Sequence, residues 1–128
     1  MRALQARLAA HGVSFGHWTF LRILWERDGL TQRELSDEAG VMQPTTGAAI
    51  REMEKLGYVK RSQASGNRKN VYVHLTPKGR ALKAKLVPLA EEVNEIGLAG
   101  VSAQDRAAAQ RALMAIIENL SRSSRPSA

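Results

Sequence analysis

Hydrophobic side chains recur at helical spacing near the start of the chain, and glycines end each run. Residues 2–11 place Leu4 and Leu8 on one face of a short helix. Residues 14–25 carry a stripe of aromatic and aliphatic side chains, which ends before Gly29. The pattern therefore predicts two amphipathic helices before residue 30.

The next helix has the clearest start signal in the sequence. Thr31 and Glu34 form an S/T-x-x-E capping box, in which each side chain satisfies an amide that the helix leaves without a partner. Leu30 and Leu35 stand at the positions of a hydrophobic staple. Gly40 then provides a turn, so a short helix and a tight turn are predicted.

A second helix follows this turn, within the stretch VMQPTTGAAIREMEKLGYVKR. Pro44 suits the first helical turn, where its missing amide costs nothing. Four side chains share the face that we expect to point inward: Thr46, Ala49, Ile50 and Met53. The opposite side is unusually small for a surface helix, because it carries Pro44, Gly47 and Ala48.

Strand signals come next. YVKRS and NVYVHL alternate apolar and polar residues, and ASGNRK between them predicts the turn of a hairpin. Thr76 and Pro77 then begin a long helix that Pro88 is expected to kink. A last helix starts at Ser102, and residues 121–128 read as a disordered tail.

Two short helices joined by a glycine turn, followed by a basic hairpin, form the layout of a winged helix-turn-helix. We expect a mainly α protein with a small β-hairpin wing, in which residues 1–128 form a single domain. The winged core covers about residues 14–76. The terminal helices, at about 1–11 and 77–120, have apolar stripes that predict either a homodimer interface or a lid on the domain.

The net charge of +7 is concentrated in one segment of the chain. Residues 41–85 hold ten basic and two acidic side chains, a net +8, whereas the remainder holds nine basic and ten acidic ones. This asymmetry favours a polyanionic partner over a merely solvated basic face. Nucleic acid fits better than a membrane, since no lysine-rich amphipathic helix with aromatic anchors is present.

Several classes of function are excluded. The chain has no cysteine, so disulfides, thiolate zinc sites and thiol redox switches are ruled out, and its three histidines lack metal-ligand spacing. No phosphate-binding loop, dinucleotide-binding glycine motif or hydrolase motif is present. We therefore predict neither an enzyme nor a cofactor or metal site. No apolar run approaches the roughly 18 residues of a membrane helix, so a cytoplasmic protein is expected.

The small outward face of the 43–55 helix suggests that it lies close to the floor of a DNA major groove, which admits one helix. Gln43 and Thr45 would reach base edges, and Ala48 would touch a thymine methyl. Arg51 would contact a guanine or a phosphate, and Lys55 a phosphate. The predicted recognition set is Gln43, Pro44, Thr45, Gly47, Ala48, Arg51 and Lys55. The competing interpretation is that another protein element packs on this face.

The wing adds a second predicted contact. Arg68 and Lys69 stand in the short turn between the two strands, where they suit insertion into a minor groove or a grip on flanking phosphates.

With these elements in order, the chain resembles the multiple-antibiotic-resistance-regulator (MarR) family of transcription factors. The matching elements are LTQRELSDEAGV, IREMEKLGYVKR, NRKNVYVHLTPKGRAL and LAEEVNEIGLAGVSAQDRAAAQRALMAIIENL, and the resemblance covers about residues 14–120. It implies a dimer built by the terminal helices, a near-palindromic DNA site, and release by a small ligand or other signal.

The sequence departs from the family pattern in three places. The wing often carries an Asp-x-Arg motif, which is matched here by Asn67 and Lys69. The recognition helix often has a threonine and a basic residue where Gly47 and Ala48 stand. The N-terminal helix is short for the family, which predicts a smaller dimer interface or a longer natural protein.

An effector pocket is the remaining candidate site. Phe15, His17, Trp18 and Leu21 would line it, although aromatic side chains at helical spacing more often form plain core. The predicted function is a sequence-specific, double-stranded DNA-binding transcriptional regulator, a homodimeric repressor whose signal is either a small organic effector or none. The alternatives are a winged-helix protein-interaction module and a non-specific architectural DNA-binding protein.

Overall fold

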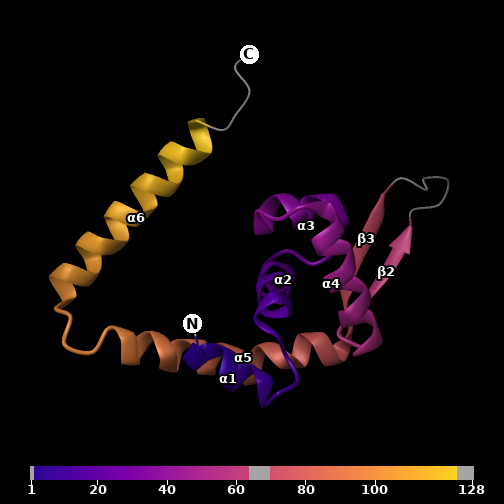
Figure 1. Cartoon of the computed structure of the whole chain (residues 1–128), viewed down its shortest axis with the longest axis horizontal. Helices are drawn as coiled ribbons and strands as arrows, with labels where there is room; N and C mark the ends of the chain where they lie inside the picture. The colour runs from indigo at the N-terminus through magenta and orange to yellow at the C-terminus, as the bar shows by residue number, and fades with distance from the viewer. Residues whose placement is uncertain (1, 64–69, 124–128) are drawn as a thin grey trace. The chain divides into compact units, whose positions relative to one another are not determined.

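The computed structural model of the protein describes residues 2–63 and 70–123. It contains two compact units, Met1–Val93 and Asn94–Ala128. The elements in chain order are α1 Arg2–Ala9, α2 Phe15–Glu26, β1 Leu30–Thr31, α3 Gln32–Ala39, α4 Gln43–Lys55, β2 Val59–Gln63, β3 Val71–Leu75, α5 Pro77–Gly97 and α6 Ala103–Ser123. Within the described residues this is a mainly α fold with a small antiparallel sheet (Figure 1).

The predicted helix starts are confirmed by their side-chain caps. Ser14 Oγ accepts a hydrogen bond from His17 N at 3.1 Å, at the start of α2. Thr31 and Glu34 form both bonds of the capping box, at 3.1 and 3.0 Å. The hydrogen bond from the Thr31 amide lowers the pKa of the Glu34 carboxyl below its usual value. Gly40 ends α3 in the left-handed conformation, with φ 68°, that favours glycine.

The sheet has one strand more than the predicted hairpin. Its order is β1-β3-β2, and both pairings are antiparallel, with Leu30 opposite Val73 and Val59 opposite Leu75. A two-residue strand such as β1 is too short to show the alternation that marks a strand in sequence. This third strand ties the start of α3 to the wing.

The hydrophobic core lies in the first unit, where buried side chains from the helices and the sheet pack around the helix-turn-helix. Its fully buried large side chains include Leu8, Leu21, Leu35, Ile50 and Met53. The two helices of the motif are also joined by a buried polar contact, because Ser36 Oγ donates to Thr46 Oγ1 at 2.7 Å. Thr46 was predicted to face inward, and this bond satisfies its hydroxyl without water.

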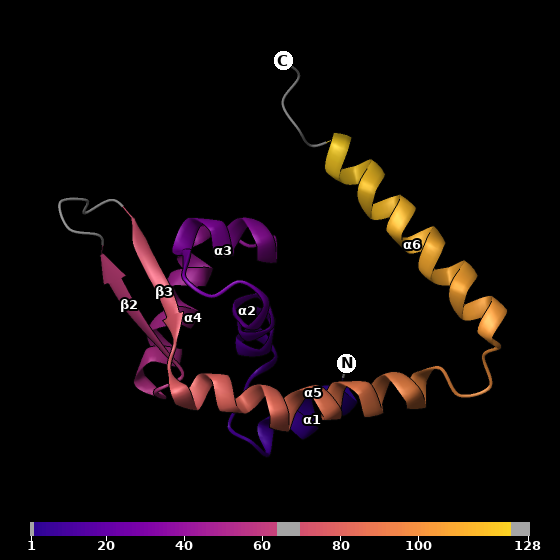
Figure 2. The ribbon, with the colours of Figure 1, turned by 180° about the vertical axis from the view of Figure 1, so that it is seen from behind.

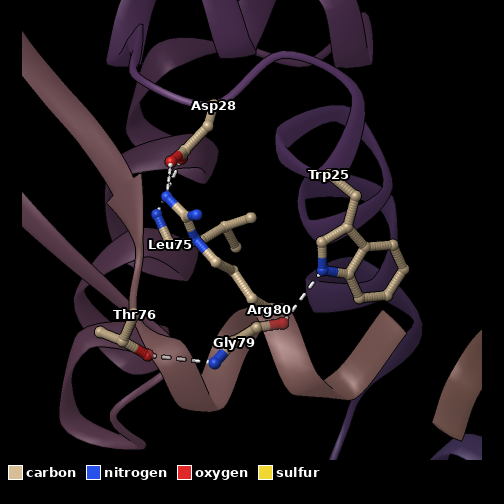
Figure 3. A network of polar contacts seen from close by, with 6 residues as sticks. All are labelled: Trp25, Asp28, Leu75, Thr76, Gly79 and Arg80. Carbon is tan, nitrogen blue, oxygen red and sulfur yellow. Dashed lines mark hydrogen bonds and ion pairs between the residues drawn. The ribbon is translucent and has the colours of Figure 1, made fainter. Parts of the chain in front are cut away.

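A polar joint connects α2, β3 and the start of α5 (Figure 3). Asp28 accepts from the Leu75 amide at 2.8 Å and pairs with Arg80 at 3.0 Å. Trp25 Nε1 donates to the Gly79 carbonyl at 3.0 Å. A side chain at Gly79 would overlap the Tyr58 carbonyl, so α5 begins in direct backbone contact with the residue that precedes β2. Glycine is therefore required there by a close approach of two backbones.

One expectation about the C-terminal helices needs correction. The helix α5 continues through Pro88 to Gly97, and the kink expected at Pro88 stays a prediction. The last helix runs to Ser123, so residues 121–123 are helical instead of belonging to a disordered tail, and residues 124–128 lie outside the described part of the chain. No helix among the described residues is long and apolar enough to cross a membrane.

Candidate nucleic-acid interface

The outward face of α4 is exposed, as the groove interpretation requires. Six of the seven predicted recognition residues lie at the surface: Gln43, Pro44, Thr45, Ala48, Arg51 and Lys55. The inward face is fixed by Thr46, Ile50 and Met53, which are each 0% exposed. Figure 1 shows α4 beside the ribbon formed by β2 and β3. Among the described residues of the first unit, no element covers the face on which the predicted DNA contacts depend.

Gly47 is the exception among the seven residues. It is buried, and a Cβ at this position would lie 3.1 Å from Gln32 Nε2 and 3.4 Å from Arg51 Nη1. Gly47 belongs to the predicted recognition set, and in the structure the side chains of Gln32 and Arg51 lie over it. Gln32, at the start of α3, thus joins the edge of the surface, although no signal in the sequence marked it.

Arg51 and two lysines supply positive charge that no carboxylate of the described residues neutralises. Arg51, Lys55 and Lys60 form no ion pair with any other described residue. Arg51 and Lys55 lie on α4, and Lys60 lies on β2. Because β2 contacts α4, helix and sheet contribute cations to neighbouring parts of one surface.

Other basic side chains in the positively charged segment are engaged within the protein. Arg61 Nη2 lies 3.0 Å from Glu54 Oε1, and this hydrogen bond holds the pKa of the Glu54 carboxyl below its usual value. Arg80 pairs with Asp28, and Lys78 donates to the Leu56 carbonyl at 3.0 Å. The excess charge of the segment is therefore only partly available to an external anion.

A histidine that was assigned to an effector pocket instead contacts α4. His17 is buried, and its Nε2 lies 2.9 Å from Oε2 of Glu52, whose side chain is 66% exposed. His17 Nδ1 has no hydrogen-bond partner among the described residues. The bond joins α2 to α4, and no local sequence pattern indicates it because the two residues are far apart in the chain.

The other proposed pocket residues belong to the core of the first unit. Trp18 and Leu21 are buried and Phe15 is half-buried against them. Trp18 packs edge-on against Trp25, with ring centroids 5.7 Å apart. The alternative interpretation, plain core, therefore describes their packing in this structure.

The wing positions Asn67, Arg68 and Lys69 lie outside the described residues. The two strands that lead to them are described, and Figure 2 shows these strands from behind. Their register, from Val59 opposite Leu75 to Gln63 opposite Val71, is continuous. Among the described residues, no group of three or more histidine or acidic side chains is placed to hold a metal ion.

The two-helix motif, the exposed face of α4 and the three-stranded sheet define a winged helix-turn-helix protein. The model of the MarR family matches residues 13–71, so this segment of the chain is a MarR-family winged helix-turn-helix.

Known proteins similar to this chain support that assignment. The HTH-type transcriptional regulator TtmR of Methylorubrum extorquens (strain PA1) is 30% identical over 107 residues, which cover 84% of this chain and 54% of TtmR. The chain therefore spans about half the length of that relative. A MarR transcriptional regulator from Methanosarcina mazei Go1 has a TM-score of 0.87 at 28% identity, covering 94% of this chain and 80% of that one. The transcriptional regulator PA3341 has a TM-score of 0.79 at 32% identity, and the match covers 93% of this chain and 88% of that one.

Proposed function

We propose that this protein is a transcriptional regulator that binds double-stranded DNA in a sequence-specific manner. The observation that carries the proposal is the face of α4, which is exposed, small at Pro44 and Ala48, and flanked by cations that have no ion-pair partner in the described part of the chain. A helix with such a face can approach the base edges of a major groove closely. The similar proteins are named as transcriptional regulators, which agrees with this role.

Individual contacts follow from position along α4. Gln43 and Thr45, at the N-terminal end, are assigned to base edges, because the first residues of a recognition helix lie deepest in the groove. Ala48 is assigned to a thymine methyl and Arg51 to a guanine or a phosphate. Lys55, at the last turn, is assigned to a phosphate, together with Lys60 on β2. Gly47 contributes by letting Gln32 and Arg51 lie across the helix.

The wing supplies the second contact in this proposal. Arg68 and Lys69, with Asn67, are assigned to the minor groove or to the phosphates beside it. Lysine keeps the positive charge that an arginine would bring but lacks its planar fork of donors. Arg68 is therefore expected to carry more of any base-dependent contact than Lys69.

We further propose that the regulator acts as a homodimer on inverted repeats. No residue of α6 is buried within the described chain, although the helix carries large apolar side chains that are more than half exposed, including Leu113, Met114, Ile116 and Ile117. An exposed apolar stripe of this extent favours association. A two-fold dimer would place two recognition helices roughly 34–36 Å apart, one turn of DNA.

The proposal includes repression that a small organic molecule relieves, as the family resemblance implies. This chain has no cysteine, so a thiol-based signal does not fit its composition. The aromatic residues first considered for the effector site are packed in the core, and we assign no effector site to them.

Selection of bound sequences from a random duplex pool tests the proposed function. A regulator should enrich a symmetric motif and bind it about 10³-fold or more tightly than random DNA. Its affinity should also fall by about 10³ or more between about 50 and 200 mM salt. An enriched pool without a motif would favour architectural binding, and salt-independent affinity would remove the DNA-binding proposal.

A further inference from the structure

Met42 is the most exposed large hydrophobic side chain among the described residues. It is 77% exposed, whereas Leu56 at the other end of α4 is 40% exposed. The neighbouring Val41 is also exposed, at 38%. Two consecutive apolar side chains therefore lie in contact with solvent at the entrance to the proposed recognition helix.

The same residue occupies a position where a polar side chain would stabilise the fold. Met42 is the N-cap of α4 and makes no side-chain cap. By contrast, Ser14, Thr31 and Ser102 each accept a hydrogen bond from an amide in the first turn of the helix that they begin. Serine, threonine, aspartate and asparagine are the residues that normally fill this position. Neither burial nor capping within the first unit accounts for a methionine here.

The backbone around Met42 is nevertheless well defined. The Val41 amide donates to the Ser36 carbonyl at 3.1 Å, which closes the turn after α3. The Met42 carbonyl accepts from the amides of Thr45 and Thr46 at 3.0 and 3.2 Å. The turn therefore fixes the backbone from which the Met42 side chain projects beside Gln43.

The surroundings of Met42 indicate what it contacts. Gln43, Pro44 and Thr45 are exposed next to it and carry no large apolar group, so beside Met42 a protein partner would find only the less exposed Val41 as a second apolar contact. In a major groove, the distinctive apolar feature is the 5-methyl group of thymine. A flexible, polarisable methionine side chain adapts well to such a methyl group.

We propose that Met42 is a specificity-determining residue that packs against a thymine methyl group in each half-site. This inference rests on the proposed function, because it requires α4 to enter a major groove. It adds an apolar base contact before the first residue of the recognition helix. The affinity for that base pair then depends on one methyl group.

The test replaces the thymines of the selected motif one at a time with deoxyuridine, which lacks only the 5-methyl group. Fluorescence anisotropy at constant salt measures the affinity of each duplex. For the wild-type chain, one position in each half-site, besides any thymine read by Ala48, should bind about three- to fivefold more weakly with deoxyuridine, the change expected for one methyl group. Met42→Ala and Met42→Ser should bind the thymine and deoxyuridine duplexes equally at that position.

Three controls isolate the contact. Leu56→Ala removes an exposed apolar side chain from the opposite end of α4 and should leave the dependence on the methyl group unchanged. A thymine read by Ala48 should keep its methyl dependence in Met42→Ala, so the two contacts are separable. Urea unfolding should show that Met42→Ser is at least as stable as wild type, because serine restores a cap.

The outcomes separate the two proposals. A symmetric motif whose half-sites show no methyl-dependent thymine, or a Met42→Ala variant that keeps the dependence, overturns the role of Met42 and leaves the proposed function intact. Failure to enrich any motif overturns both.

Discussion

His17 on α2 and Glu52 on α4 are joined by a 2.9 Å hydrogen bond, although the imidazole is buried and the carboxylate is largely exposed. The bond links a core helix to the proposed recognition helix. Because the other ring nitrogen has no partner among the described residues, Glu52 is the one described group that satisfies this imidazole. The orientation of α4 therefore depends partly on a core side chain that does not itself reach the proposed DNA surface.

Removing the Glu52 carboxylate should destabilise the protein. Glu52→Ala leaves both ring nitrogens of His17 buried without a partner, which is expected to lower the free energy of unfolding by about 1–3 kcal/mol. Glu52→Gln keeps a hydrogen-bonding group and should lose less. Urea unfolding at neutral pH measures both. Equal stability of Glu52→Ala and wild type would show that the bond contributes nothing to the fold.

The pairing of Glu54 with Arg61 predicts a pH dependence of stability. The pKa of Glu54 is depressed in the folded state, chiefly by the hydrogen bond from Arg61. Its contribution is therefore complete above the ordinary glutamate pKa of about 4.3 and is lost as the pH falls through the depressed folded value. Because the pair is partly exposed, we expect it to contribute about 1 kcal/mol or less to the free energy of unfolding.

The measurement compares wild type with Glu54→Gln from about pH 7 to about pH 3. The difference in unfolding free energy between them should shrink as the pH falls. Glu26→Gln is a matched control, since Glu26 makes no ion pair with a described residue. A difference that stays constant over the whole range would contradict the role of the pair.

Replacing each of two helical glycines with alanine should change the stability of the protein in opposite directions. At Gly79, an added Cβ overlaps the Tyr58 carbonyl, and a loss of about 1–3 kcal/mol or more is expected. At Gly47, the Cβ meets only the ends of the Gln32 and Arg51 side chains, which can shift. Alanine there gains up to about 1 kcal/mol of helix propensity. Thermal unfolding of both variants checks the signs, and a stabilised Gly79→Ala would refute the close approach.

Substitutions on α4 should separate base contacts from phosphate contacts. Thr45→Ala and Arg51→Ala are expected to weaken binding to the selected motif more than to random DNA, each base contact being worth about 1–3 kcal/mol. Lys55→Ala should weaken both by the same factor. Binding titrations on the two kinds of duplex measure this. A uniform loss in all three variants would refute the assignment of base contacts.

The wing should contribute mainly through charge. Arg68→Ala and Lys69→Ala are each expected to reduce the slope of log affinity against log salt concentration by about one. Titrations at several salt concentrations measure the slope. Lys83→Ala, on α5, is a control at an exposed lysine outside the proposed contacts. An unchanged slope in both wing variants would remove the wing from the proposed interface.

Local chemistry explains which parts of the fold the sequence predicted. The capping box of Thr31 and Glu34 involves residues three apart, and the small side of α4 follows from helical spacing alone. The burial of Gly47 was not predictable in this way, because Gln32 reaches it from the preceding helix. The contact of His17 was not predictable either, because its hydrogen-bond partner Glu52 lies on another helix. Contacts between elements that are distant in the chain produce no periodic pattern in the sequence, so the sequence does not reveal them.

The meeting of Gly79 with Tyr58 has a mechanical consequence. Backbone touches backbone there, so no flexible side chain lies between the first turn of α5 and the strand that leads into the wing. Close-packed contacts of this kind transmit strain with little loss. A displacement of the first turn of α5 would therefore be transmitted to the base of the hairpin. Because Gly79 has no Cβ, the two elements are expected to move together as one rigid unit.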